Sequence, residues 1–126
     1  MAITIKEMSR EMDEIEQYLM TISPAIVSMK DVEDGTSIAV DGTLIFTDEK
    51  EKNGEIQKVD ILSIITPDKK VYSCQSVTFK RSLKDIEKIM NGKPFAVLKM
   101  SGTTNAGRPY IDCQLDIASI SSKKSK

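Results

Sequence analysis

The sequence has no histidine and no tryptophan among its 126 residues. Histidine is the commonest general base and a frequent metal ligand, and Ser–His and Cys–His nucleophilic arrangements cannot form without it. Asp112 and Asp116 lie four residues apart on one predicted strand, with Asp60 as a third carboxylate, but no spacing fixes them as a metal site. We therefore expect no enzymatic activity, no metal or other cofactor, and no small-molecule substrate.

Long apolar segments are also missing. No run of residues approaches the roughly 18 apolar positions of a membrane-spanning helix, and the charged segment 1–14 lacks the apolar stretch of a secretion signal. The two cysteines, Cys74 and Cys113, each lie inside an apolar, strand-like segment. These features favour an intracellular protein of about one domain, without a membrane partner, whose cysteines are reduced core residues.

The formal net charge is only −1, but the first half of the chain has few basic residues and the second half has few acidic ones. Residues 1–60 contain 6 Lys/Arg and 14 Asp/Glu, whereas residues 61–126 contain 12 and 5, so the halves carry −8 and +7. A polyanionic partner would therefore contact the second half. The acidic first half argues against indiscriminate, very tight binding to duplex DNA, for which basic domains are usual.

The N-terminal segment 4–22 has the periodicity of an amphipathic helix. Thr4 and Glu7 form a capping-box pattern, and Ser23-Pro24 would end the helix. Apolar residues recur at steps of three and four: Ile5, Met8, Met12, Ile15, Leu19 and Ile22. This heptad seam has two readings that the sequence leaves open, namely packing on the core of its own domain or pairing with another subunit to form a homo-oligomer.

From Ala25 onward the apolar periodicity changes to two, which indicates strands. After residue 34 we predict five strands and one short helix, in this order: strand 36–48 with a bend at Asp41-Gly42, strand 55–66, strand 70–79, helix 83–90, strand 94–100 and strand 109–115. This order is that of the OB-fold, a five-stranded Greek-key barrel. The loops 49–54 and 101–108 would then flank its ligand face.

These patterns divide the chain into three regions. Residues 1–24 form the N-terminal helical region, which is a candidate oligomerisation element. Residues 25–118 form the mainly β, OB-like domain. Residues 119–126 form a Ser/Lys tail that we expect to be disordered.

Aromatic rings and cations lie close together in the predicted strands, as single-stranded nucleic acids require for base stacking and phosphate contact. Tyr110 is expected to point away from the apolar face of its strand. The loop 101–108 has two glycines, small polar side chains and Arg108, which suits closure over a nucleic-acid backbone. We assign base stacking to Phe46, Tyr72 and Tyr110, with core packing as the open alternative for each. The predicted phosphate path consists of Lys69, Lys70, Lys80, Arg81, Lys99 and Arg108.

Three short motifs occur in a fixed order between about Asp34 and Leu115. The first is Asp34-Gly35-Thr36, and the second is DKKVYS at 68–73. The third has the order F-x-V, G-T, G and Q-L, at Phe95, Val97, Gly102, Thr103, Gly107, Gln114 and Leu115. With these motifs the chain resembles the small single-stranded DNA-binding proteins of tailed bacteriophages that replicate by protein priming, whose second motif reads D-G-x-L-Y-S.

The resemblance implies an OB-like protein that binds single-stranded DNA without sequence preference. It would coat and protect displaced strands during phage DNA replication in the host cytoplasm. The base-stacking tyrosines of that family fall on Tyr72, on Phe46, where a ring remains, and on Asn53, where none exists, so a weaker contact is expected there. The alternative is a phage-encoded protein-interaction module, which would bind a host or replication protein through the acidic half and the helix seam.

Overall fold

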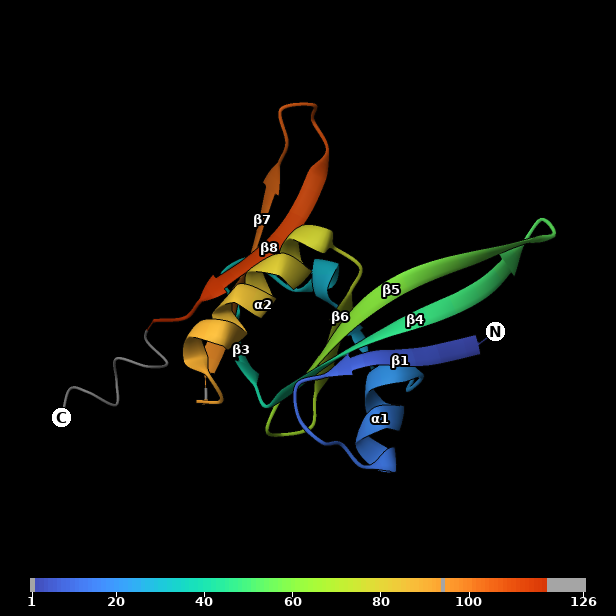
Figure 1. Ribbon diagram of the computed structural model, residues 1–126. Helices are drawn as coiled ribbons and strands as arrows, with labels where there is room; N and C mark the ends of the chain where they lie inside the picture. Colours follow the sequence, from blue (N-terminus) through green and yellow to red (C-terminus); the bar gives the residue numbers. More distant parts are fainter. Residues whose placement is uncertain (1, 94, 118–126) are drawn as a thin grey trace.

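A long antiparallel hairpin, β4 (Gly42–Lys52) and β5 (Glu55–Ile65), is the central element of the computed structural model, which describes residues 2–93 and 95–117. Its ladder is continuous from Gly42, opposite Ile65, to Lys52, opposite Glu55. Asn53 and Gly54 make the turn with φ of 55° and 80°, the left-handed backbone for which Asn-Gly is favoured in hairpins. The predicted loop 49–54 is therefore reduced to two residues, and the hairpin projects far from the core (Figure 1).

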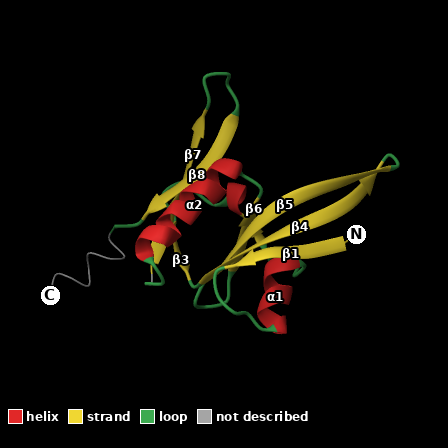
Figure 2. Ribbon diagram, in the orientation of Figure 1, coloured by secondary structure: helices red, strands yellow, loops and turns green. Residues whose placement is uncertain are grey.

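The strands form two sheets (Figure 2). The first has the order β1-β4-β5-β6-β2 and adds three strands to the hairpin: β1 (Ala2–Met8), β6 (Val71–Cys74) and β2 (Val27–Ser28), the last followed by a 3₁₀ turn, η1 (Met29–Asp31). The second has the order β3-β7-β8: β3 (Ser37–Val40), β7 (Phe95–Thr103) and β8 (Pro109–Leu115). Asp41 alone separates β3 from β4, so the predicted bent strand carries the chain from one sheet into the other.

The prediction of a mainly β fold is confirmed, and the strands after residue 34 follow the predicted order. The sheets, however, are open. Within the described residues β6 pairs with β5 and β2, and β8 pairs with β7, but no ladder joins β6 to β8. The structure therefore leaves a gap on one side, opposite the bent strand that links the two sheets.

Helix α2 (Val77–Met90) covers the main core between the sheets. Ser76 caps its first turn by accepting a hydrogen bond from the Phe79 backbone N–H at 3.1 Å, and Asn91 ends it in the left-handed conformation. The helix begins earlier than the predicted residue 83, because Phe79 belongs to its apolar stripe and not to a strand. The buried stripe consists of Phe79, Leu83, Ile86 and Met90.

The predicted helix 4–22 is wrong. Residues 2–8 form β1, which covers the outer edge of β4 and places Ile5 opposite Phe46. Only Glu14–Thr21 are helical, as α1, with Asp13 as the N-cap. Ile3 and Ile5 alternate on one face of segment 2–6, as in a strand, although Ile5 also fits the heptad spacing with Met8. Ile3 and Ile5 pack against a second core, on the opposite face of the sheet: Met12, Met20, Leu44, Phe46, Ile65 and Val71.

Arg10 fastens the β1–α1 loop to the point where the chain changes sheets. Its guanidinium donates hydrogen bonds to both Glu16 carboxylate oxygens at 3.2 and 2.7 Å, to Asp41 Oδ2 at 3.0 Å and to the Asp41 carbonyl at 3.1 Å. Lys69 Nζ donates to the same Glu16 carboxylate at 3.2 Å. Gly42 permits this approach, because a Cβ there would lie 2.8 Å from Met12 Cε and 3.1 Å from Arg10 Nε.

Both cysteines are free thiols in the main core, as predicted. Burial raises the pKa of Cys74 to about 11 and that of Cys113 to about 12, so both stay un-ionised at neutral pH. In the part of the chain that is described, no helix is long and apolar enough to cross a membrane. Likewise, no group of three or more described His, Cys, Asp or Glu residues is placed to hold a metal ion. The predicted tail, 119–126, lies outside the described residues.

The Arg10–Glu16–Lys69 network gives the fold a predicted pH dependence. Hydrogen bonds from Arg10, and then from Lys69, lower the pKa of Glu16 from 4.5 to about 2. A carboxyl with a depressed folded-state pKa stabilises the fold above its unfolded pKa, and this stabilisation is lost as the pH falls toward the folded value. The contribution of Glu16 should therefore be complete above pH 4.5 and lost between pH 4.5 and about 2.

Glu16→Gln should lower the melting temperature at neutral pH and flatten its decline between pH 4.5 and about 2. Thermal unfolding followed by circular dichroism at a series of pH values measures this. Glu14→Gln, which changes an exposed carboxylate in the same helical turn, is the matched control. A parallel decline for Glu16→Gln and the wild type across that pH range would contradict the assignment.

Candidate nucleic-acid interface

Each sheet ends in a hairpin arm that leaves the core (Figure 1). The first arm is the distal part of β4 and β5, where residues 50–58 are exposed. The second arm is the distal part of β7 and β8, where residues 100–110 are exposed except for half-buried Gly102. The two arms diverge from the region in which β6 and β8 approach without pairing, so they stand on either side of the open edge of the fold.

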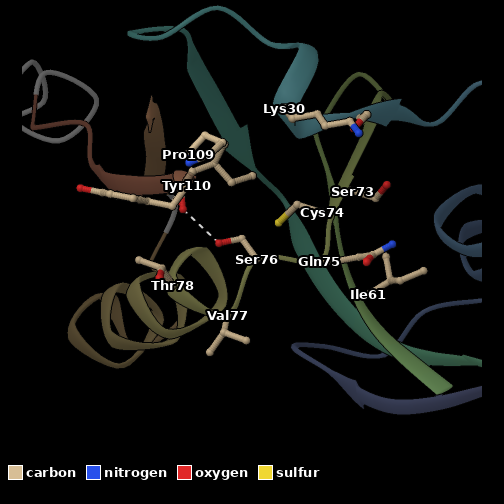
Figure 3. Close-up of a pocket in the computed structure, with 12 residues that line it drawn as sticks. Lys30, Ile61, Ser73, Cys74, Gln75, Ser76, Val77, Thr78, Pro109 and Tyr110 are labelled. Carbon is tan, nitrogen blue, oxygen red and sulfur yellow. Dashed lines mark hydrogen bonds between the residues drawn. The ribbon is translucent and has the colours of Figure 1, made fainter. Parts of the chain in front are cut away.

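A groove of about 550 Å³ lies at this open edge, a size typical of pockets that hold small ligands. Two residues that line it are joined by a hydrogen bond, which Ser76 Oγ donates to the Ile111 carbonyl at 3.0 Å (Figure 3). Its walls combine apolar surface from Ile61 and Val77 with polar side chains, among which Lys30 and Gln75 are exposed. Such a mixture suits a ligand that has both flat apolar surfaces and charged groups.

Tyr110 lies at the rim of the groove and is 40% exposed. Its ring is directed away from Cys74 and Gln75, above Thr78 (Figure 3). The predicted orientation is confirmed, because Cys113 on the opposite face of β8 is buried and Ile111 and Leu115 pack against the main core. Of the three predicted stacking residues, Tyr110 is therefore the one with an accessible ring beside the groove.

The other two predicted stacking residues are placed differently. Phe46 is 3% exposed within the second core, so its ring has no free face in this structure on which a base could stack. Tyr72 is half-buried and packs against the main core from β6. Asn53 forms the turn at the tip of the first arm. The sequence motif around Tyr72 thus marks a strand that borders the groove, while its ring supports the core.

Lys99, which was assigned to the predicted phosphate path, is not accessible to a ligand. Its side chain is only 5% exposed and makes an ion pair with Asp34 at 3.1 Å. Ser101 Oγ donates a second hydrogen bond to the same carboxylate. The hydrogen bonds from Ser101 and Lys99 hold the pKa of Asp34 below its usual value. Lys99 therefore anchors the base of the second arm to the turn before β3, and its charge is already compensated.

Four of the five remaining predicted cations fall into two groups. Lys69 and Lys70 lie in the turn before β6, at the opposite end of that strand from the groove residues Ser73 to Thr78, and Lys69 pairs with Glu16. Lys80 and Arg81 follow the groove residues Val77 and Thr78 in the first turns of α2, and Arg81 is exposed. Lys80 Nζ donates to the Asp60 carbonyl at 3.2 Å.

Arg108 is the exposed cation of the second arm. The loop beneath it is an ordered turn, because Thr104 N–H donates to the Arg108 carbonyl and Gly107 N–H donates to the Thr104 carbonyl, both at 2.8 Å. In addition, Arg108 N–H donates to Thr104 Oγ1 at 3.1 Å. The segment expected to close over a nucleic-acid backbone is thus a hydrogen-bonded hairpin end, on which Arg108 is exposed.

Sequence reasoning missed Lys30 and Gln75. Lys30 follows β2 in a 3₁₀ turn, and Gln75 follows β6, and both line the groove (Figure 3). Neither is next to another cation or to an aromatic residue in the sequence. Only the parallel pairing of β2 with β6 brings them to the same wall, which is a non-local contact that no local pattern signals.

Comparison with known proteins supplies the family. No curated protein and no solved structure gives a significant match to the chain. A family model described as Phage Single-stranded DNA-binding protein matches residues 13–116. The match begins before α1, so this helix lies inside the family region. The region thus extends further toward the N-terminus than the sequence motifs, which begin at Asp34. β1 lies outside it. Since the match covers most of the chain, including every element that builds the groove, the protein belongs to the phage single-stranded DNA-binding protein family and acts in phage DNA replication.

Proposed function

We propose that single-stranded DNA binds in the groove between β6 and β8, flanked by the two arms. The observation that carries the proposal is that an accessible ring, Tyr110, and an exposed cation, Lys30, line the same groove, beside the outer edge of β8, which has no strand partner among the described residues. Stacking and phosphate contacts are available to any base sequence, so binding would be non-specific. The protein would coat and protect displaced strands in the host cytoplasm, as a non-enzymatic component of replication.

The strand order supports an OB-like reading of this fold. With β3 and β4 taken as one bent strand, the strands follow the order β6-β5-β4/β3-β7-β8, with α2 between β6 and β7 in the sequence. An OB-fold binds ligands on its second and third strands and through the first and last hairpin loops. These elements correspond here to β5, β6 and the two arms. We propose that residues 25–118 form this module and that it is open between β6 and β8.

Tyr110→Ala should weaken binding to an oligo-dT strand about tenfold, because stacking on one ring contributes about 1–3 kcal/mol. Fluorescence anisotropy with a labelled oligonucleotide measures the affinity. Tyr72→Phe is the matched control: it keeps the ring that packs on the core and should leave affinity and melting temperature nearly unchanged. An unchanged affinity for folded Tyr110→Ala would place the binding path elsewhere.

Lys30→Ala and Arg108→Ala should each make binding less dependent on salt. For single strands the slope of log K against log salt is about −0.7 per neutralised phosphate, so each substitution should reduce its magnitude by about 0.7. Lys70→Ala removes an exposed lysine at the far end of β6 and should leave the slope unaltered. A change at Lys70 without a change at Lys30 would instead support the phosphate path predicted from the sequence.

We also propose that α1 mediates self-association, although the heptad seam itself does not exist. Three residues at steps of three and four remain exposed on the helix: Ile15 at 70%, Tyr18 at 47% and Ile22 at 57%. The exposed acidic residues Glu11 and Glu14 lie at or just before the start of the helix, while the second half of the chain has the excess of lysine and arginine. A second copy therefore offers a surface of complementary charge, and association would raise apparent affinity along a strand through multivalency.

Ile15→Ser combined with Ile22→Ser should lower the molar mass measured by light scattering at micromolar protein concentration. Deletion of residues 1–22 is unsuitable, because it would also remove β1 and the buried side chains of Met12 and Met20. Ile56→Ser, at a residue that is 68% exposed on the first arm, is the control. A mass that is unchanged by the double substitution would exclude this helix face as the interface.

The same helix face also fits the alternative function, a protein-interaction module, since an exposed apolar surface can bind a different protein as well as a second copy. A gel shift with oligo-dT, with duplex DNA as competitor, separates the two functions. Binding that resists the duplex competitor supports the proposed role. The absence of a shift at micromolar protein and low salt would favour a module that recruits a host or replication protein.

A further inference from the structure

Gly102 and Tyr110 face each other on the second arm. They are directly opposed in the β7–β8 ladder. A Cβ built on Gly102 would lie 2.6 Å from Tyr110 Oη, 2.8 Å from Cζ and 3.2 Å from Cε2. Side-chain Cβ atoms essentially never approach other atoms within 3.0 Å. The phenol end of Tyr110 therefore lies directly on the Gly102 backbone, in space that any other residue would occupy.

The backbone at Gly102 does not itself need glycine. Four of the six glycines have positive φ angles, at Gly35, Gly54, Gly92 and Gly107, but Gly102 does not. A glycine inside a strand normally weakens it, because it adds backbone entropy and has no side chain to pack. Here it lies in a nine-residue strand, Phe95–Thr103. The close approach of the tyrosine ring is the feature of the structure that accounts for glycine at this position.

We propose that Gly102 is the positioning residue of a nucleobase subsite whose stacking surface is Tyr110, an inference that rests on the proposed binding of single-stranded DNA. Packing against Gly102 fixes one side of the ring, while 40% of the residue stays exposed at the groove rim. A platform that is already oriented loses little side-chain entropy when a base stacks on it. The ligand of this subsite is a purine or pyrimidine ring, which is recognised by its π face.

The arm that holds this platform is itself anchored on both sides. Ser101, next to Gly102, is hydrogen-bonded to Asp34, and Lys99 is paired with the same carboxylate. On the other side Ser76 donates to the carbonyl of Ile111, next to Tyr110. These contacts hold the backbone on both strands beside the ring, and the Gly102 backbone lies against the phenol end of the side chain.

A double-mutant cycle tests the subsite. Gly102→Ala should keep the fold, because the atoms that must move are the end of a flexible side chain, and an alanine suits a strand better than glycine does. Its melting temperature should equal or exceed that of the wild type. Its affinity for oligo-dT, however, should fall between about threefold and the full loss caused by Tyr110→Ala, since the displaced ring no longer presents its stacking face.

In the Tyr110→Ala background, Gly102→Ala should have no further effect on affinity, because no ring remains to be displaced. Tyrosine emission is a second readout: the chain has three tyrosines and no tryptophan, and the quenching on oligo-dT addition should be smaller in Gly102→Ala. The matched control is Gly42→Ala. The added methyl group would crowd Met12 and Arg10, neither of which lines the groove, so affinity should be unaltered in the folded protein.

Additive losses in the cycle, or an affinity unchanged by Gly102→Ala while the wild type binds, would overturn the positioning role and leave the proposed function intact. Failure of the wild type itself to bind oligo-dT would instead overturn the proposed function. The two failures are therefore distinguished by the wild-type measurement in the same experiment.

Discussion

The strand that passes from β3 through Asp41 into β4 is the constraint on which the rest of the structure depends, because it is paired in both sheets. Arg10 secures the crossing through Asp41 and Glu16, and Gly42 makes room for it. Since the sheets are joined on this side and α2 packs between them, they need not pair on the other side. Among the described residues β2 covers the outer edge of β6 and β8 has no strand on its outer edge, so the two sheets stay unjoined on that side and the groove lies between them.

The ion pairs and hydrogen bonds near the groove separate residues that support the arms from residues left for a ligand. Lys99 and Ser101 are engaged with Asp34, and Lys6 is paired with Asp60, which also accepts from Thr47. These contacts hold the arms in place. Lys30, Arg108 and the ring of Tyr110 are exposed instead. These groups are therefore available to a ligand without the loss of the contacts that anchor the arms.

The sequence was sufficient for the mainly β fold, the bend at Asp41, the buried cysteines and the family, because each depends on local periodicity or a short motif. It failed for segment 4–22, where Ile5 fits both the strand alternation with Ile3 and the heptad spacing with Met8, and only pairing with β4 decides. It did not indicate the burial of Phe46 and Lys99, because that burial depends on the second core and on Asp34, both distant in sequence. Lys30 had no local signal, since the pairing of β2 with β6 alone brings it to the groove.

The central claim is that single-stranded DNA lies in the groove between β6 and β8. Titration of ¹⁵N-labelled protein with oligo-dT, followed through the backbone amide shifts, tests it most directly. We expect the largest shifts at Lys30, at residues 73–78 and at Tyr110 and Ile111, with small shifts at Lys69 and Lys70. Shifts centred on the turn 66–70, with the groove residues unaffected, would contradict it.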